Sequence, residues 1–96
     1  MADRIDEADA QARMAHLHPD WRLEGHTLTR RFGFKGFQKA VMYANAAAFL
    51  GEREGHHPDI AFGWGYCSVT FTTHDVGGLS ENDFDCAAKL DALVDG

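Results

Sequence analysis

Residues 56–74 read HHPDIAFGWGYCSVTFTTH, and they carry the clearest secondary-structure pattern of the chain. Large apolar side chains alternate with small ones over residues 60–64, and a second alternation covers residues 66–73. A period of two is typical of β-strands, and the glycines on both sides of Trp64 favour a turn between the strands. The stretch therefore predicts an antiparallel hairpin.

Another pair of strands is predicted upstream. Residues 21–24 and 27–34 alternate in the same way around a break at Gly25-His26. Arg30 falls on the apolar side of the second strand, where it conflicts with the register that the alternation predicts.

Three segments show the three- to four-residue apolar spacing of helices. The first follows a candidate N-cap at Asp3 and ends at Pro19. The second runs from Phe37 to Glu54, and the third opens at Ser80. The apolar positions of the first segment are Ile5, Ala8, Ala12 and Ala15.

The predicted order of elements is therefore α-β-β-α-β-β-α. Strands that arrive in hairpin pairs with helices between them indicate an antiparallel sheet covered by helices. We expect an α+β fold, a two-layer sandwich with a four-stranded antiparallel sheet and three helices on one face. A chain of 96 residues has the size of one domain, so we expect residues 1–96 to form a single domain.

The charge of the chain argues against two classes of partner. Its net charge is −6, and its only basic doublet is Arg30-Arg31. Nucleic acids and anionic membrane surfaces attract basic patches, so we expect neither as a direct partner. The acidic N-terminus lacks the apolar run of a signal peptide, and Cys67 and Cys86 are too few for a disulfide scaffold. These features predict buried free cysteines and a cytoplasmic location.

The segment from Phe37 to Glu54 is apolar over more than half of its circumference. Met42, Ala46, Phe49 and Leu50 extend its apolar stripe beyond one face. A helix with this distribution usually has a second surface to cover. We therefore expect self-association through this helix, as a homodimer or homotetramer.

Three histidines are predicted to meet at one end of the second hairpin. If its turn is centred near Trp64-Gly65, the numbers of paired residues sum to about 129 or 130. His56 and His74 sum to 130, and His57 pairs nominally with Thr73. The doublet before one strand and the single histidine after the other should therefore share one end of the sheet.

Imidazole suits proton transfer near neutral pH because its unperturbed pKa is ~6.5. The histidine cluster therefore predicts an acid–base site. A structural interpretation competes for His56 alone, which could interact with the dipole of the preceding helix, while Pro58 could simply end that helix. A three-histidine metal site is a further alternative, but adjacent histidines in an extended segment point to opposite sides. His16, His18 and His26 are interpreted as surface residues.

Two acidic residues near the cluster have competing interpretations. Ser80 and Asp83 have the Ser-x-x-Asp spacing of a capping box, and this interpretation of Asp83 is preferred. Glu52 lies one helical turn before His56 and is interpreted as a solvated helix residue. Either acid could instead orient a histidine.

The residues around the histidines resemble a known family. The chain contains Glu52-x-x-x-His56-His57-Pro58-Asp59, followed by Val69-Thr70-Phe71-Thr72-Thr73-His74-Asp75-x-Gly77-Gly78-Leu79-Ser80-x-x-Asp83. As a pair, these elements resemble the signature of the pterin-4a-carbinolamine dehydratases. The segment from Trp21 to Phe37 is similar to an earlier block of the same family.

This resemblance implies the dehydration of 4a-hydroxytetrahydropterin to quinonoid dihydropterin, in support of tetrahydrobiopterin recycling. It implies His56, His57 and His74 as catalytic residues and requires neither a cofactor nor a metal. The supporting or substrate-binding positions that it implies are Glu52, Pro58, Thr73, Asp75 and Asp83. The implied partners are the pterin itself and an aromatic amino acid hydroxylase pathway. The alternative is a non-enzymatic dimerisation module that serves a transcription regulator.

One segment departs from the family pattern. Many members have an aromatic residue directly after the His-His-Pro-acid run and an Asn-rich turn, where this chain has Ile60 and residues 62–66. The change affects the expected fit to the pterin ring. Trp64 could supply a replacement aromatic surface, or it could belong to the core or to an interface.

Overall fold

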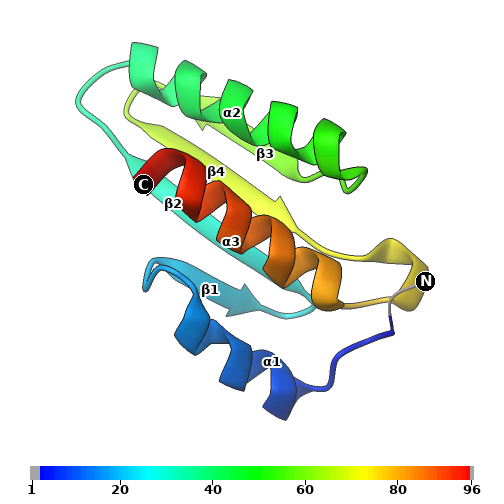
Figure 1. Ribbon diagram of the computed structural model, residues 1–96. Coiled ribbons are helices and arrows are strands. Elements are labelled where there is room, and N and C mark those ends of the chain that lie inside the picture. The colour runs from blue at the N-terminus through cyan, green and yellow to red at the C-terminus, as the bar shows by residue number, and fades with distance from the viewer. Residues whose placement is uncertain (1–2, 96) are drawn as a thin grey trace.

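The computed structural model describes residues 3–95 and has the predicted order of elements (Figure 1). Its helices and strands are α1 (Glu7–Arg13), β1 (Trp21–Glu24), β2 (Thr27–Gly33), α2 (Gln38–Glu54), β3 (Asp59–Gly63), β4 (Tyr66–Phe71) and α3 (Glu81–Asp95). Two short 3-10 helices, η1 (Met14–His16) and η2 (His74–Val76), follow α1 and β4. Within residues 3–95, no helix is both long enough and apolar enough to cross a bilayer.

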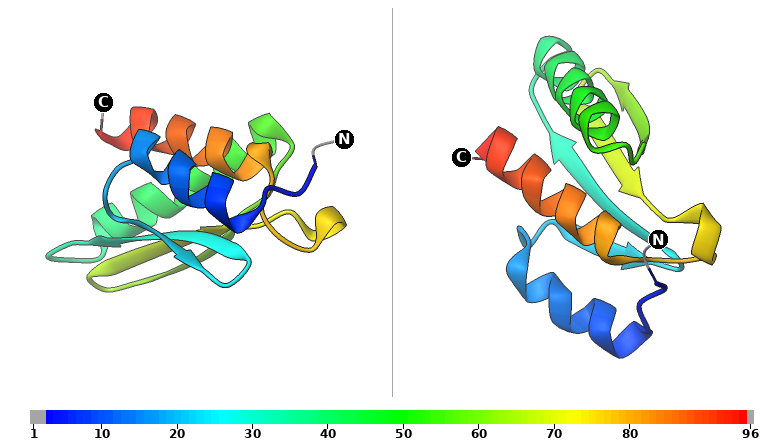
Figure 2. Two further views of the ribbon diagram at one scale, coloured as in Figure 1. Left: turned by 90° about the horizontal axis from the view of Figure 1, so that it is seen from below. Right: turned by 45° about the vertical axis from the view of Figure 1, so that its right-hand side comes forward.

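The four strands form one antiparallel sheet in the order β1-β2-β4-β3. All three helices lie on the same face of this sheet, as the left view of Figure 2 shows. Helix α2 packs over β3 and β4, and α3 lies beside α2. The predicted two-layer α+β fold is confirmed.

The β3–β4 hairpin has the register that the turn position predicts. Asp59 pairs with Thr70 and Gly63 pairs with Tyr66, so the numbers of paired residues sum to 129. Gly65 adopts a φ of 87° in the turn, a conformation that glycine reaches without steric cost. The residues just before β3 and just after β4 therefore lie at the same end of the sheet.

The hydrophobic core lies between the sheet and the helices. Its largest fully buried apolar side chains come from both layers and are Leu28, Leu50, Val69, Phe71 and Leu90. Cys67 and Cys86 are buried free cysteines, as predicted.

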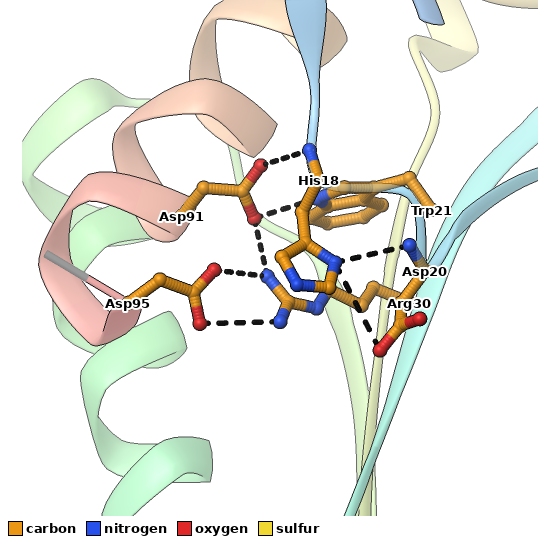
Figure 3. A network of polar contacts seen from close by, with 6 residues as sticks. All are labelled: His18, Asp20, Trp21, Arg30, Asp91 and Asp95. Atoms are coloured by element: carbon orange, nitrogen blue, oxygen red, sulfur yellow. Dashed lines mark hydrogen bonds and ion pairs between the residues drawn. The ribbon is translucent and has the colours of Figure 1, made fainter.

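Arg30 occupies the apolar side of β2 without a change of register. Its side chain is 4% exposed, and its guanidinium donates to Asp91 at 2.6 Å and to Asp95 at 2.7 and 3.2 Å (Figure 3). Asp91 also accepts hydrogen bonds from the indole of Trp21 and the backbone N–H of His18. A buried charge is tolerated where it is paired and hydrogen-bonded. These contacts explain the exception in the alternation of β2.

The first helix differs from its prediction. Its N-cap is Asp6 rather than Asp3, and the Asp6 side chain accepts a hydrogen bond from the N–H of Asp9 at 2.8 Å. Ala10 is its buried residue, whereas the predicted apolar positions Ala8, Ala12 and Ala15 are exposed. Alanine is found both inside proteins and on their surfaces, so a stripe of alanines defines the buried face of a short helix poorly.

Candidate acid–base site

The candidate site lies at one end of the sheet, where four segments begin or end. They are the C-terminal end of α2, the segment His56–Pro58, the helix η2 after β4, and the N-terminal end of α3. Figure 1 shows these segments together on the right, although they are far apart in the sequence. This arrangement follows from the hairpin register and from α3 beginning soon after η2.

The end of α2 directs His56 toward α3. Gly55 adopts the left-handed conformation with φ 66°, and the N–H of His56 donates to the carbonyl of Gly51 at 3.0 Å. This is the hydrogen-bond pattern of a helix that ends on a glycine. Gly51 also allows close approach of Pro58, since a Cβ on Gly51 would lie 2.5 Å from the Pro58 Cδ. Pro58 therefore packs on the last turn of α2.

His56 is bound to a fully buried carboxylate. Its Nε2 lies 2.5 Å from Oδ1 of Asp83, and the two side chains are 15% and 0% exposed. The imidazole lies nearly parallel to the ring of Phe71, with 6.0 Å between the ring centroids. His56 is thus mostly shielded from solvent and has a fixed polar partner.

Asp83 caps α3 and binds His56 at the same time. Its second oxygen, Oδ2, accepts hydrogen bonds from the N–H of Ser80 at 2.9 Å and from the hydroxyl of Thr73 at 2.8 Å. The bond from Ser80 is one half of a capping box, so the preferred interpretation of Asp83 is confirmed but incomplete. Ser80, predicted only as a helix cap, makes a further contact that no short-range sequence signal indicates: its hydroxyl lies 2.7 Å from the Thr73 hydroxyl.

His57 is hydrogen-bonded to the other candidate acid, Glu52. The distance from His57 Nε2 to Glu52 Oε1 is 2.8 Å, and the two side chains are 69% and 81% exposed. Glu52 is therefore solvated, as predicted, but it also orients a histidine. Solvent weakens such an exposed pair, so it holds its geometry far less firmly than the buried pair does.

His74 and Asp75 lie in η2, and both are exposed. Within residues 3–95, no hydrogen bond joins any two of His56, His57 and His74. The predicted cluster is thus a set of three imidazoles around one end of the sheet, and each has a different environment. Of the other three histidines, all predicted to lie on the surface, His16 and His26 are exposed. His18 is partly buried, and its Nδ1 accepts a hydrogen bond from the N–H of Asp20 at 3.0 Å.

Two other kinds of chemistry gain no support from the described residues. Across residues 3–95, no three His, Cys, Asp or Glu side chains are arranged to hold a metal ion. Burial raises the pKa of the Cys67 thiol and raises the pKa of Cys86 to about 11. Both thiols therefore stay protonated near neutral pH and are poor nucleophiles.

The fold and the site together define the class of protein: a small α+β domain with a carboxylate-bound imidazole suited to proton transfer. A family model described as pterin 4 alpha carbinolamine dehydratase matches residues 3–93. The chain belongs to this family of hydro-lyases, enzymes that eliminate water.

Curated relatives agree with this assignment. A protein of Paracoccus denitrificans named as a pterin-4-alpha-carbinolamine dehydratase is 46% identical over 95 residues, which cover 97% of this chain and 88% of the relative. A protein of Nitrosomonas eutropha with the same name is 42% identical over 90 residues, covering 94% and 80% of the two chains.

Two solved structures resemble the fold. A transcriptional coactivator/pterin dehydratase from Brucella melitensis has a TM-score of 0.84 and 30% identity, and the match covers 95% of this chain and 98% of the other. A pterin dehydratase-like protein identified as a RuBisCO assembly factor in the alpha-carboxysome has a TM-score of 0.64 and 34% identity, with 81% and 92% covered.

Proposed function

We propose that this chain catalyses the loss of water from a 4a-hydroxytetrahydropterin to give the quinonoid dihydropterin, with His56 as its main proton-transfer group. The contact that supports this most directly is the 2.5 Å bond between His56 and the buried Asp83. Membership of the family supplies the substrate class. Tetrahydrobiopterin recycling beside an aromatic amino acid hydroxylase pathway, in the cytoplasm, belongs to the same proposal.

The proposed reaction needs an acid and a base but no oxidant. The C4a–O bond and the N5–H bond break, a double bond forms between C4a and N5, and water leaves. Hydroxide is a poor leaving group, so an acid must protonate the oxygen as the C–O bond breaks. A base must take the N5 proton. One proton is delivered and one is removed, so positioned imidazoles suffice, and each such group contributes about 10²–10⁴-fold.

His56 fits the role of the base. Asp83 Oδ2 already accepts two hydrogen bonds, and Oδ1 faces His56 Nε2. An ionised carboxylate only accepts hydrogen bonds, so His56 donates its Nε2 proton to Asp83. The proposed base is the neutral ring, whose lone pair is then on Nδ1. In this mechanism Nδ1 takes the N5 proton, and the Asp83 carboxylate stabilises the imidazolium that forms.

The acid is one of the two exposed imidazoles, His57 or His74. Glu52 accepts a hydrogen bond from His57 Nε2, which orients the ring. His74 is carried by η2, next to Asp75. Thr73 and Pro58 support the site by holding Asp83 and the His56 segment in place. Single alanine variants of His57 and His74 decide between the two candidate acids.

The test is the dehydration rate of freshly generated carbinolamine. We expect the purified protein to accelerate dehydration over the spontaneous rate and the double variant His57→Ala/His74→Ala to lose most of that acceleration. The matched control is His16→Ala, which removes an exposed histidine outside the site and should leave the rate unchanged. No acceleration by the wild-type protein would overturn the proposal.

A second role is favoured by the exposed apolar side chains of α2 and β3. Met42 and Phe49 lie seven residues apart on α2 and are 57% and 63% exposed. Phe62 on β3 is 44% exposed and packs beside Phe37, and Trp64 in the following turn is 74% exposed, so Trp64 is not a core residue. We propose that these exposed side chains mediate self-association, as a homodimer or homotetramer.

Sedimentation at micromolar concentration tests this second role. We expect an oligomer for the wild-type chain and a monomer for Phe49→Glu. The control is Leu93→Glu, which changes an exposed residue of α3 and should leave the molecular mass of the assembly unchanged. A wild-type monomer would contradict self-association. A non-enzymatic module for a transcription regulator is the remaining alternative, and it would gain support if His57→Ala/His74→Ala kept its cellular function.

A further inference from the structure

The hydrogen bonds behind His56 extend one residue beyond the groups named in the proposed mechanism. Ser80 is 0% exposed, like Asp83. Its hydroxyl lies 2.7 Å from the Thr73 hydroxyl, which lies 2.8 Å from Asp83 Oδ2. Asp83 Oδ1 then lies 2.5 Å from His56 Nε2. Ser80, Thr73, Asp83 and His56 are thus connected in series.

The direction of each hydrogen bond follows from the number of hydrogens available. Thr73 has one hydroxyl hydrogen, and it goes to Asp83 because an ionised carboxylate only accepts. The contact between the two hydroxyls must then use the hydrogen of Ser80, which donates to Thr73. Ser80 Oγ in turn accepts the N–H of Asn82 at 3.3 Å. Only one order of donors satisfies all these contacts.

This order of donors determines which oxygen of the Asp83 carboxylate is available to His56. Asp83 Oδ2 holds two donors, the Thr73 hydroxyl and the Ser80 N–H, so Oδ1 remains for His56. If Thr73 turned away, the carboxylate would lose one of the two contacts that set its rotation. Misplacement of a catalytic group by about 1 Å can reduce the rate by about 10²-fold.

We propose that Ser80 is a positioning residue of the acid–base site. Its hydroxyl orients Thr73, Thr73 holds Asp83, and Asp83 keeps His56 in the tautomer with the proton on Nε2. The kinetic consequence rests on the proposed dehydratase function. The consequence for the His56 tautomer can be measured without turnover.

Asp6, which caps a different helix, serves as the matched control for a purely structural role of Ser80. Ser80 caps α3, and Asp6 caps α1 through a 2.8 Å bond from the N–H of Asp9. Removing either capping side chain should lower the midpoint of unfolding by a similar small amount. Only Ser80, however, has a cap side chain connected to Asp83. Ser80→Ala and Asp6→Ala therefore separate positioning from capping.

The kinetic test compares Ser80→Ala, Ser80→Thr and Asp6→Ala. The Ser80→Ala change should lower kcat about tenfold, the equivalent of one hydrogen bond, with KM altered less than about twofold. Ser80→Thr keeps the hydroxyl and should restore kcat, and Asp6→Ala should leave it unchanged. In a Thr73→Val background, Ser80→Ala should have no further effect on kcat, because Ser80 acts through Thr73.

The second readout is the ¹⁵N spectrum of the His56 ring. We expect a proton on Nε2 in the wild-type protein and a mixture of tautomers in both Ser80→Ala and Thr73→Val. His56 spectra that match those of Asp6→Ala would overturn the role of Ser80. If the wild-type protein does not accelerate dehydration, the proposed function fails, but the ring spectra still decide whether Ser80 positions His56.

Discussion

Two carboxylate networks attach α3 to the rest of the domain, and they differ in the side chain that the carboxylate binds. Near the start of the helix, Asp83 binds the imidazole of His56 at 2.5 Å. Near its end, Asp91 and Asp95 bind the guanidinium of Arg30 at 2.6 and 2.7 Å (Figure 3). Both networks join residues that are far apart in the sequence, and both place a buried polar group in an otherwise apolar layer.

The two networks differ in whether the partner of the carboxylate is a side chain that can exchange a proton near neutral pH. Burial acts to lower the pKa of Arg30, but hydrogen bonds to Asp95 and Asp91 outweigh it and raise that pKa, so the guanidinium stays charged. The imidazole of His56 belongs to the side-chain type that exchanges protons near neutrality. The same arrangement of a helix carboxylate and a strand or loop partner therefore suits stability at one end of α3 and chemistry at the other.

The largest effect on turnover is expected for Asp83→Asn. Asparagine retains an oxygen for Ser80 and Thr73 but presents an NH₂ group to His56, which forces the His56 proton from Nε2 to Nδ1. We expect kcat for carbinolamine dehydration to fall about 10²–10⁴-fold, with the far-UV circular dichroism unchanged. A kcat within twofold of the wild-type value would mean that Asp83 serves only as a cap.

The corresponding change in the other network is Arg30→Met. It removes the charged hydrogen bonds to Asp91 and Asp95, and both carboxylates keep some contact with solvent, so the free energy of unfolding should fall by about 1.5–3 kcal/mol in urea titrations. The kcat should stay close to wild type, because Arg30 does not contact the His56 site. A large loss of kcat at full folding would show that the two networks are coupled.

The pH dependence of stability is expected to reflect the Arg30–Asp95 pair. The hydrogen bond to Arg30 lowers the pKa of Asp95 in the folded state. The stability from this pair is therefore complete above the unfolded pKa of about 3.9 and is lost as the pH falls through the lower folded pKa. Asp95 is 37% exposed, so we expect less than about 1 kcal/mol from it.

The control for this measurement is Asp95→Asn. Urea unfolding between pH 5 and pH 2 should show a steeper loss of stability for the wild-type chain than for the variant. Parallel curves would contradict the assigned pairing.

The smallest effect is expected at the exposed pair. Replacing Glu52 with Gln removes the charge opposite His57, but both side chains are more than two-thirds exposed. The free energy of unfolding should change by less than about 1 kcal/mol, and salt should reduce even that difference. A larger change would indicate that Glu52 is buried in an assembly.

Much of the fold could be predicted because its signals are local. The alternation around Trp64 set the turn, and the β3–β4 pairs sum to 129 as the turn position required. The end of α2 at Gly55 and the cap of α3 at Ser80 also follow from short-range sequence signals.

The remaining features depend on contacts between distant residues. Arg30 conflicted with the apolar face of β2 because its partners, Asp91 and Asp95, lie 61 and 65 residues further along the chain. The same is true of Asp83, whose cap was visible in the sequence but whose bond to His56 spans 27 residues. Hairpin arithmetic brought three histidines to one end of the sheet, but it carried no information on which ring is buried.

In the proposed mechanism, His56 is held by Asp83 and transfers the proton in the elimination of water. The most direct measurement is the turnover of His56→Gln on freshly generated carbinolamine, beside wild type and Arg30→Met. Glutamine can still donate a hydrogen bond toward Asp83 but does not act as a base near neutral pH. We expect kcat to fall at least about 10²-fold in His56→Gln and to stay close to the wild-type value in Arg30→Met. A His56→Gln protein with wild-type turnover would show that His56 does not transfer the proton.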